Sequence, residues 1–198
     1  FFQVAQGYSP FEAGLRTLPW TAMPIVVAPI AGVLTERIGS RIPLAFGMAL
    51  MAAGLAWFAV VSTPTVPYPV LVPALMIAGA GMAFFFAPTA QLVLSAVRRE
   101  EEGRASGINS TVREIGGVFG VAVLASVFSA NGGYESPQAF TDGMVPALWV
   151  GAAIVGAGAP ATLALPVARA AVARSVTARA EGGAPHEHEL GPERQRLD

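Results

Sequence analysis

The sequence contains no cysteine and no lysine, and it has few charged residues of any kind. Without cysteine the chain can form neither disulfides nor thiolate metal sites. Charged residues make up 13% of the 198 residues, about half of the roughly 25% typical of soluble domains. The net charge of -1 gives no basic surface for nucleic acid. A hydrophobic content of 54% excludes disorder over most of the chain and argues against an ordinary soluble domain.

Four long stretches have no charged residue at all: 17–35, 42–97, 115–134 and 143–168. A helix of about 20 apolar residues crosses the hydrocarbon core of a bilayer, which is roughly 30 Å thick. The second stretch has room for two such helices. The proline-rich segment Ser62–Pro69 would separate them, because proline cannot continue a helix. The expected fold class is therefore all-α and integral to the membrane.

Five membrane-spanning helices are predicted, over residues 15–35, 43–61, 70–97, 105–130 and 143–167. Residues 1–168 would then form one partial transmembrane bundle, and residues 169–198 would form a disordered cytoplasmic tail. The first residues, Phe1-Phe2-Gln3, resemble the end of an earlier apolar helix. We therefore expect the chain to be part of a longer membrane protein.

Arginine is unevenly distributed among the segments that flank the spans. Eleven of the twelve lie in or near alternate segments: Arg37, Arg41, Arg98, Arg99, Arg104, Arg113, Arg169, Arg174, Arg179, Arg194 and Arg196. Because segments rich in Arg stay in the cytoplasm, this pattern predicts a multi-pass protein of the plasma (inner) membrane with a cytoplasmic tail.

Three prolines, Pro19, Pro24 and Pro29, recur through the first span. Each one removes a backbone donor and bends the helix. In lipid the freed carbonyls need partners in neighbouring helices or in a wet cavity. This pattern favours a helix that lines a substrate cavity, with Trp20 and Met23 as candidate contacts. A helix that is merely kinked is the alternative.

Polar side chains within the other spans are rare. Gln91 in the third span could bind a substrate or a facing helix. Asn109 and Arg113 lie four residues apart in the fourth span and share a face. An Arg at that depth, roughly 13 Å into the helix, marks a functional site that needs a partner, for which Glu114 and Glu36 are candidates. In the alternative reading, Arg113 extends to the cytoplasmic headgroups.

Glycine is spaced for close helix packing in two of the spans. Gly116 and Gly120 form a Gly-x-x-x-Gly step beside Gly117, and Gly79 and Gly81 bring small residues to the third span. Such residues let helix backbones approach closely. Gly116, Gly117 and Gly120 are therefore predicted to form a helix-packing face.

Motifs for enzymatic chemistry are missing. The sequence has no Walker A pattern, no metal-ligand cluster and no Ser-His-Asp set within the spans. The segment His186–Glu189 could bind a metal weakly, but a solvated tail explains it better. We expect neither an enzyme nor a cofactor.

Three segments resemble one family of transporters. Gly32–Arg41 resembles the Gly-x-Leu-x-Asp-Arg-x-Gly-Arg-Arg loop that follows the second helix of each half in the major facilitator superfamily. Glu36 stands at its acidic position, and Ser40 replaces one basic residue. Gln6–Leu15 and Gly103–Gly117 are similar to an external loop and a late helix start of the drug:proton antiporter branch with fourteen helices, the EmrB/QacA-like transporters.

The resemblance implies that the spans are the last five helices of a C-terminal six-helix bundle. It implies proton-coupled, multidrug-type efflux of hydrophobic or amphipathic compounds by alternating access. Its partners would be the lipid bilayer, the missing N-terminal half, a small hydrophobic substrate and protons. The carboxylate that couples transport to protons would lie in that missing half. Substrate would be held between the halves near the midplane.

The resemblance also implies a cytoplasmic latch loop, in which Glu36, Arg37 and Arg41 pair across helix ends while Gly32 and Gly39 allow close approach and a tight turn. Two other functions stay open. One is a non-transporting membrane-embedded fragment or structural partner subunit. The other, an importer of small polar solutes, predicts more polar groups in the spans than are present.

Overall fold

The computed structural model describes residues 1–95 and 102–164. They form five helices: α1 (Pro10–Ile38), α2 (Arg41–Val61), α3 (Tyr68–Ser95), α4 (Glu102–Asn131) and α5 (Pro137–Ala164). All five are long and apolar enough to cross a membrane, and the described residues contain no strand. The predicted all-α fold with five transmembrane helices is therefore confirmed. Arg98, Arg99 and the predicted tail lie outside the described residues.

All five helices begin before the spans predicted from charge, and α1 and α5 do so by the widest margin. At α1, the Ser9 hydroxyl accepts from the Glu12 backbone N–H at 3.3 Å, and Glu12 accepts from the Ser9 N–H at 2.9 Å. At α5, the Ser136 hydroxyl accepts from the Ala139 N–H at 3.1 Å. Serine followed by proline is a strong helix start, because the serine caps an orphan donor and proline suits the first turn. These two helices therefore begin before residues 15 and 143, where the predicted spans start.

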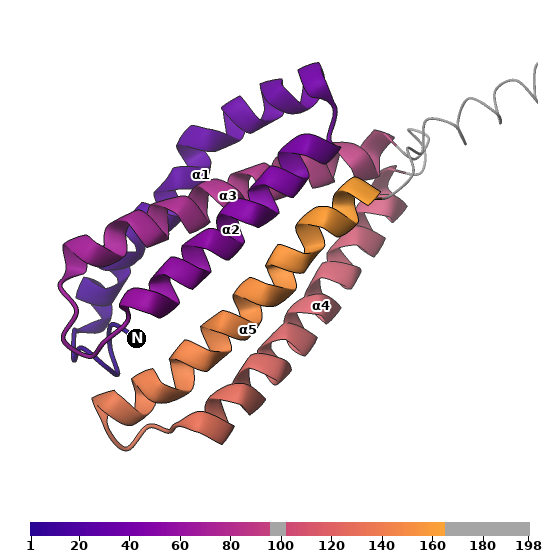
Figure 1. Ribbon diagram of the computed structural model, residues 1–198. Coiled ribbons are helices and arrows are strands. Elements are labelled where there is room, and N and C mark those ends of the chain that lie inside the picture. The colour runs from indigo at the N-terminus through magenta and orange to yellow at the C-terminus, as the bar shows by residue number, and fades with distance from the viewer. Residues whose placement is uncertain (96–101, 165–198) are drawn as a thin grey trace, which may run out of the picture. The chain divides into compact units, whose positions relative to one another are not determined.

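The helices pack side by side in an order that differs from their order in the chain. Helix α3 packs against α1 and α2, α2 packs against α5, and α5 packs against α4, as can be followed in Figure 1. The segment before α1 lies beside the α2–α3 connection (Figure 1). We call the end that holds this segment and the α2–α3 connection the α2–α3 end of the bundle. The α1–α2 connection lies at the opposite end.

Helices α2 and α3 approach so closely that only glycine fits at their contact. A Cβ added to Gly47 would lie 2.7 Å from the Phe84 carbonyl carbon, and one added to Gly81 would lie 2.7 Å from the Gly47 carbonyl oxygen. A Cβ on Gly54 would similarly meet the backbone of Ala78 at 2.6 Å. Small residues at such contacts bring the two backbones into van der Waals range. The α2–α3 pair is therefore closely packed.

The main apolar cluster lies at the α2–α3 end and includes residues that precede α1. Its buried members are Phe2, Ala13, Val66 and Leu71, with Phe1, Tyr8, Phe58, Val61, Tyr68 and Leu75 packed against them. The Gln6 side-chain amide donates to the Val66 carbonyl at 2.9 Å, which ties the leading segment to the α2–α3 connection. The residues before α1 are thus an integral part of the bundle.

Helix α4 is packed least. None of its residues with described side chains is buried. It meets α5 near their shared connection, where a Cβ on Gly143 would lie 2.8 Å from the Phe128 ring and carbonyl. Phe128, Tyr134 and Phe140 also form an aromatic cluster there, with ring centroids 5.1 to 5.7 Å apart. The middle of α4 leaves most of its apolar surface uncovered by described residues.

Candidate functional site

Trp20 and Met23, predicted to line a cavity, both lie against α3 at Gly79. A Cβ added to Gly79 would overlap the Trp20 carbonyl oxygen and lie 3.0 Å from the Met23 Cβ. Pro24 has no N–H, so it cannot donate to that carbonyl four residues earlier. Part of the Trp20 side chain stays open, with 41% of the residue exposed. A carbonyl freed by proline in α1 thus lies against the backbone of α3, while the role of Trp20 and Met23 in lining a cavity stays a prediction.

Arg113, the charged candidate, joins α4 to α3. Its guanidinium carbon lies 5.9 Å from the centre of the Phe86 ring, within the range of a weak cation–π contact. Its Nη2 lies 3.5 Å from Glu114 Oε1, so Glu114 and not Glu36 is its ionic partner among the described residues. The two side chains are 55% and 77% exposed. An open pair of this kind contributes little stability and leaves Arg113 free to bind another group.

Gln91 and Asn109, the uncharged polar candidates, are both half-buried. Gln91 lies five residues beyond Phe86 on α3, and Asn109 lies one turn before Arg113 on the same face of α4. Gly79 and Phe86 are separated by seven residues of helix, about 10 Å along the α3 axis. The five candidates are thus spread along α3. Those of α1 lie near Gly79, and Arg113 of α4 lies near Phe86. The structure does not gather the five candidates into one closed pocket within the described residues.

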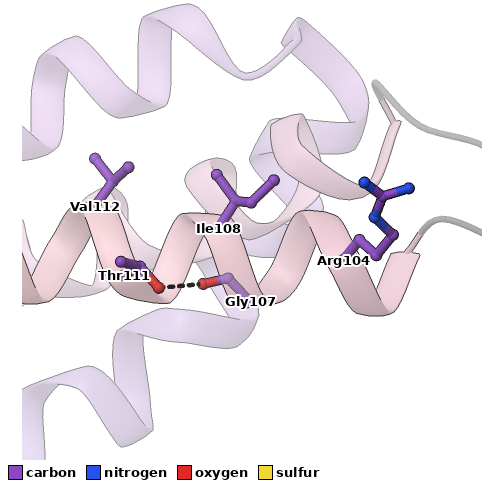
Figure 2. A pocket seen from close by; sticks show the side chains of 5 residues that line it. All are labelled: Arg104, Gly107, Ile108, Thr111 and Val112. Atoms are coloured by element: carbon purple, nitrogen blue, oxygen red, sulfur yellow. Dashed lines mark hydrogen bonds between the residues drawn. The ribbon is translucent and has the colours of Figure 1, made fainter.

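A separate hollow in the described residues lies on α4. It has a volume of about 440 Å³ and is lined by Arg104, Gly107, Ile108, Thr111 and Val112. Figure 2 shows these side chains along one helix, with the Thr111 hydroxyl donating to the Gly107 carbonyl at 2.9 Å. None of the predicted cavity residues lines it. Because a single helix forms it, we interpret it as open helix surface and not as a complete binding site.

The loop predicted to act as a latch forms a sharp turn between α1 and α2. Gly39 ends α1 with φ 83° and ψ 165°, and its N–H donates to the Thr35 carbonyl at 3.0 Å. This region of backbone geometry is essentially restricted to glycine. Glu36 and Arg37 are exposed, and neither forms an ion pair with another described residue. The turn explains the glycine at position 39, while the latch itself stays a prediction.

Several glycines predicted to pack are open in the structure. A Cβ added to Gly116, Gly117 or Gly120 would have no neighbour within 4 Å, and the same holds for Gly32. Of the glycines named from sequence, Gly79 and Gly81 do contact other helices closely. Sequence reasoning missed Gly47 and Gly54, because they are not spaced as Gly-x-x-x-Gly. The packing role of the three α4 glycines stays a prediction.

Sequence reasoning also missed the aromatic environment of Arg16. Tyr8, Arg16 and Tyr68 come together at the α2–α3 end, although 60 positions separate the two tyrosines. The guanidinium carbon of Arg16 lies 3.8 Å from the Tyr8 ring centre and 5.0 Å from that of Tyr68. No local pattern could have revealed this, since the contact depends on the α1–α3 packing. Elsewhere among the described residues, no group of three or more His, Asp or Glu could hold a metal.

Comparison with known proteins places this geometry in a family. Residues 1–185 match the family model described as Major Facilitator Superfamily. The chain is 38% identical to the Multidrug resistance protein Stp of Mycobacterium tuberculosis, over 66% of this chain and 24% of that protein. It is 32% identical to the Tetracenomycin C resistance and export protein of Streptomyces glaucescens, over 74% and 27% of the two chains. No solved structure matches it.

A third relative, the Uncharacterized transporter YebQ of Escherichia coli, is 34% identical over 70% of this chain and 31% of that protein. The chain therefore spans about a quarter to a third of the length of these relatives. Five apolar helices of spanning length define a multi-pass helical membrane protein. The chain belongs to the Major Facilitator Superfamily of transporters. The resemblance drawn from its loop and helix segments is confirmed, and its relatives include proteins named for drug resistance and export.

Proposed function

We propose that this chain is part of a secondary transporter that exports hydrophobic or amphipathic compounds, driven by proton entry. The observation that carries this proposal is the family match over residues 1–185, together with relatives named for multidrug resistance and for export of an antibiotic. The sparse polar groups on α1, α3 and α4 suit apolar cargo, because drug-sized ligands bind mainly to apolar walls with a few placed polar groups.

Transport would follow alternating access between two helical halves. The relatives are three to four times as long as the matched region, and we propose that a second bundle of the same polypeptide faces this one. Substrate would then bind near the midplane, against Trp20, Met23, Gln91, Asn109 and Arg113. The uncovered middle of α4 is consistent with this partner. Gly116, Gly117 and Gly120 would receive one of its helices.

The orientation in this proposal follows from the arginine pattern. The end with Arg37, Arg41 and Arg104 would face the cytoplasm across the plasma membrane, and the α2–α3 end would face outward. Glu36, Arg37 and Arg41 would pair across the cytoplasmic ends in one conformation and release in the other. Glu114 is the carboxylate nearest the middle of a described helix, and it pairs with Arg113. Following the family resemblance, we assign the proton-coupling group to the second bundle.

An efflux assay on the full-length protein tests this function. Cells that express it should extrude a preloaded hydrophobic dye, and an uncoupler of the proton gradient should abolish the extrusion. Efflux that continues at the same rate after the gradient collapses would overturn proton coupling. Dye accumulation equal to that of cells without the protein, despite normal membrane insertion, would instead support the non-transporting alternative.

A further inference from the structure

Arg16 is held between two tyrosine rings at the α2–α3 end of the bundle. The two rings lie 3.8 Å (Tyr8) and 5.0 Å (Tyr68) from the guanidinium carbon. Both distances are well inside the roughly 6 Å range of cation–π attraction. Tyr8 precedes α1 and Tyr68 begins α3, so three separate parts of the chain build this aromatic cage.

Arg16 forms no salt bridge with another described residue, although the nearby charge of Glu12 also acts on it. The nearest candidate in sequence, Glu12, instead accepts from the N–H and the hydroxyl of Ser9, each at 2.9 Å. The Nε atom of Arg16 is fully buried and has no hydrogen-bond partner. The Arg16 side chain as a whole is partly buried, and the two tyrosine rings are the groups that lie against its guanidinium.

The cage does not depend on the Arg16 side chain for its construction. The Tyr68 hydroxyl donates to the backbone carbonyl of residue 16 at 3.2 Å, a bond that any residue there could accept. The Tyr68 ring also packs against Phe2, with centroids 6.3 Å apart. The Tyr8 N–H donates to the Phe2 carbonyl at 3.0 Å. Both rings should thus keep their places if the guanidinium is removed.

A cavity of about 290 Å³ adjoins the cage and is lined by Glu12, Leu15, Arg16 and Tyr68. It brings a carboxylate and an apolar side chain next to the aromatic rings. Aromatic rings beside an acidic group are the usual recognition elements for quaternary ammonium ions. The site therefore has the parts of an organic-cation site, with the guanidinium of Arg16 in the place of the ligand.

We propose that Arg16 is a tethered occupant of an organic-cation site formed by Tyr8, Tyr68 and Glu12. By filling the cage, Arg16 keeps small organic cations out of this end of the bundle. Arg16 is then a residue that determines specificity by exclusion. The binding site stands on the geometry alone, whereas its consequence for the choice of exported compounds rests on the proposed function.

The test is a gain of binding. The full-length protein in lipid nanodiscs is titrated calorimetrically with tetramethylammonium, the smallest quaternary ammonium ion. Arg16→Ala should bind it at least tenfold more tightly than the parent protein. Arg16→Lys should not, because a lysine ammonium can still occupy the cage. Adding Tyr8→Leu to Arg16→Ala should abolish the gain, whereas adding Tyr8→Phe should preserve it because the ring remains.

Two results would overturn the proposal. One is that Arg16→Ala is folded and monodisperse yet binds no tighter than the parent protein. The other is that the gain survives in the Arg16→Ala, Tyr8→Leu double variant. If Arg16→Ala does not insert, Arg16→Gln provides the same comparison with a neutral side chain of similar reach. Since binding is measured without transport, a failure of the efflux assay leaves this result unaffected.

Discussion

Gly79 of α3 lies directly against the backbone carbonyl oxygen of Trp20 in α1, where a Cβ would overlap that oxygen. Pro24 removes the N–H that would otherwise bond this carbonyl within α1. The contact therefore places a glycine, which has no side chain, opposite a backbone carbonyl that proline has freed from its helix hydrogen bond. A second pair follows the same logic: Gly47 of α2 lies against Phe84, whose carbonyl is left without a helix donor by Pro88. In a membrane, such freed carbonyls need neighbouring protein.

Gly79→Ala should destabilise the full-length protein by about 1–3 kcal/mol, because the added methyl group forces α1 and α3 apart. Gly14→Ala is the matched control, since a Cβ there has no neighbour within 4 Å and alanine favours a helix. Thermal unfolding in detergent measures both variants. Equal unfolding temperatures of the two variants would show that the α1–α3 contact accommodates the methyl group without loss of stability.

Gly39→Ala should also lower stability, by about 1–3 kcal/mol, because the backbone of Gly39 has a conformation that side chains disfavour. Gly32→Ala should be neutral or slightly stabilising, as Gly32 lies inside helix α1 with open space around its Cα. The same unfolding measurement compares them. If the two substitutions had the same effect, backbone geometry would not be the reason for glycine at position 39.

Arg113→Glu should reduce dye efflux by the full-length protein at least tenfold while membrane insertion stays normal, if Arg113 contacts the substrate as we propose. The Glu114 pair is largely exposed, so breaking it should change stability by less than about 1 kcal/mol. Arg113→Lys distinguishes the two interpretations of this residue, a functional contact and extension to the cytoplasmic headgroups. Lysine reaches the headgroups equally well but lacks the planar guanidinium. Full efflux by both variants would remove Arg113 from the transport mechanism.

Gly120→Leu should impair efflux by the full-length protein at least fivefold, because the proposed partner helix could no longer approach α4. Val118→Leu is the control on a different face of α4, where the residue is 70% exposed and the change in size is small. Efflux and the amount of folded protein are measured for each variant. Identical behaviour of the two would show that no helix packs against the glycine face.

Much of the fold could be read from local features of the chain. The uncharged stretches located all five helices, since hydropathy is a property of each segment by itself. The segment Ser62–Pro69 correctly predicted the break between α2 and α3. The helix starts at Pro10 and Pro137 were missed because charge was used to set the boundaries, although serine followed by proline marked both.

The candidate site was less predictable, because it depends on which helices meet. Glu114 was correctly considered as the partner of Arg113 because it is adjacent in sequence. The contacts of Trp20 with Gly79 and of Arg113 with Phe86 could not be foreseen. The absence of neighbours around Gly116 within the described residues could not be foreseen either, because Gly116 and Gly120 have the Gly-x-x-x-Gly spacing of a packing face.

The sequence by itself determined that this protein crosses a membrane, how many helices its described part contains and to which family it belongs. Those properties follow from the free energy of placing each segment in lipid and from short local motifs. Only the tertiary structure decided which glycines carry the helix contacts and that Tyr8 and Tyr68 enclose Arg16. Contacts between distant segments depend on the rotation and depth of each helix relative to its neighbours, which hydropathy does not specify.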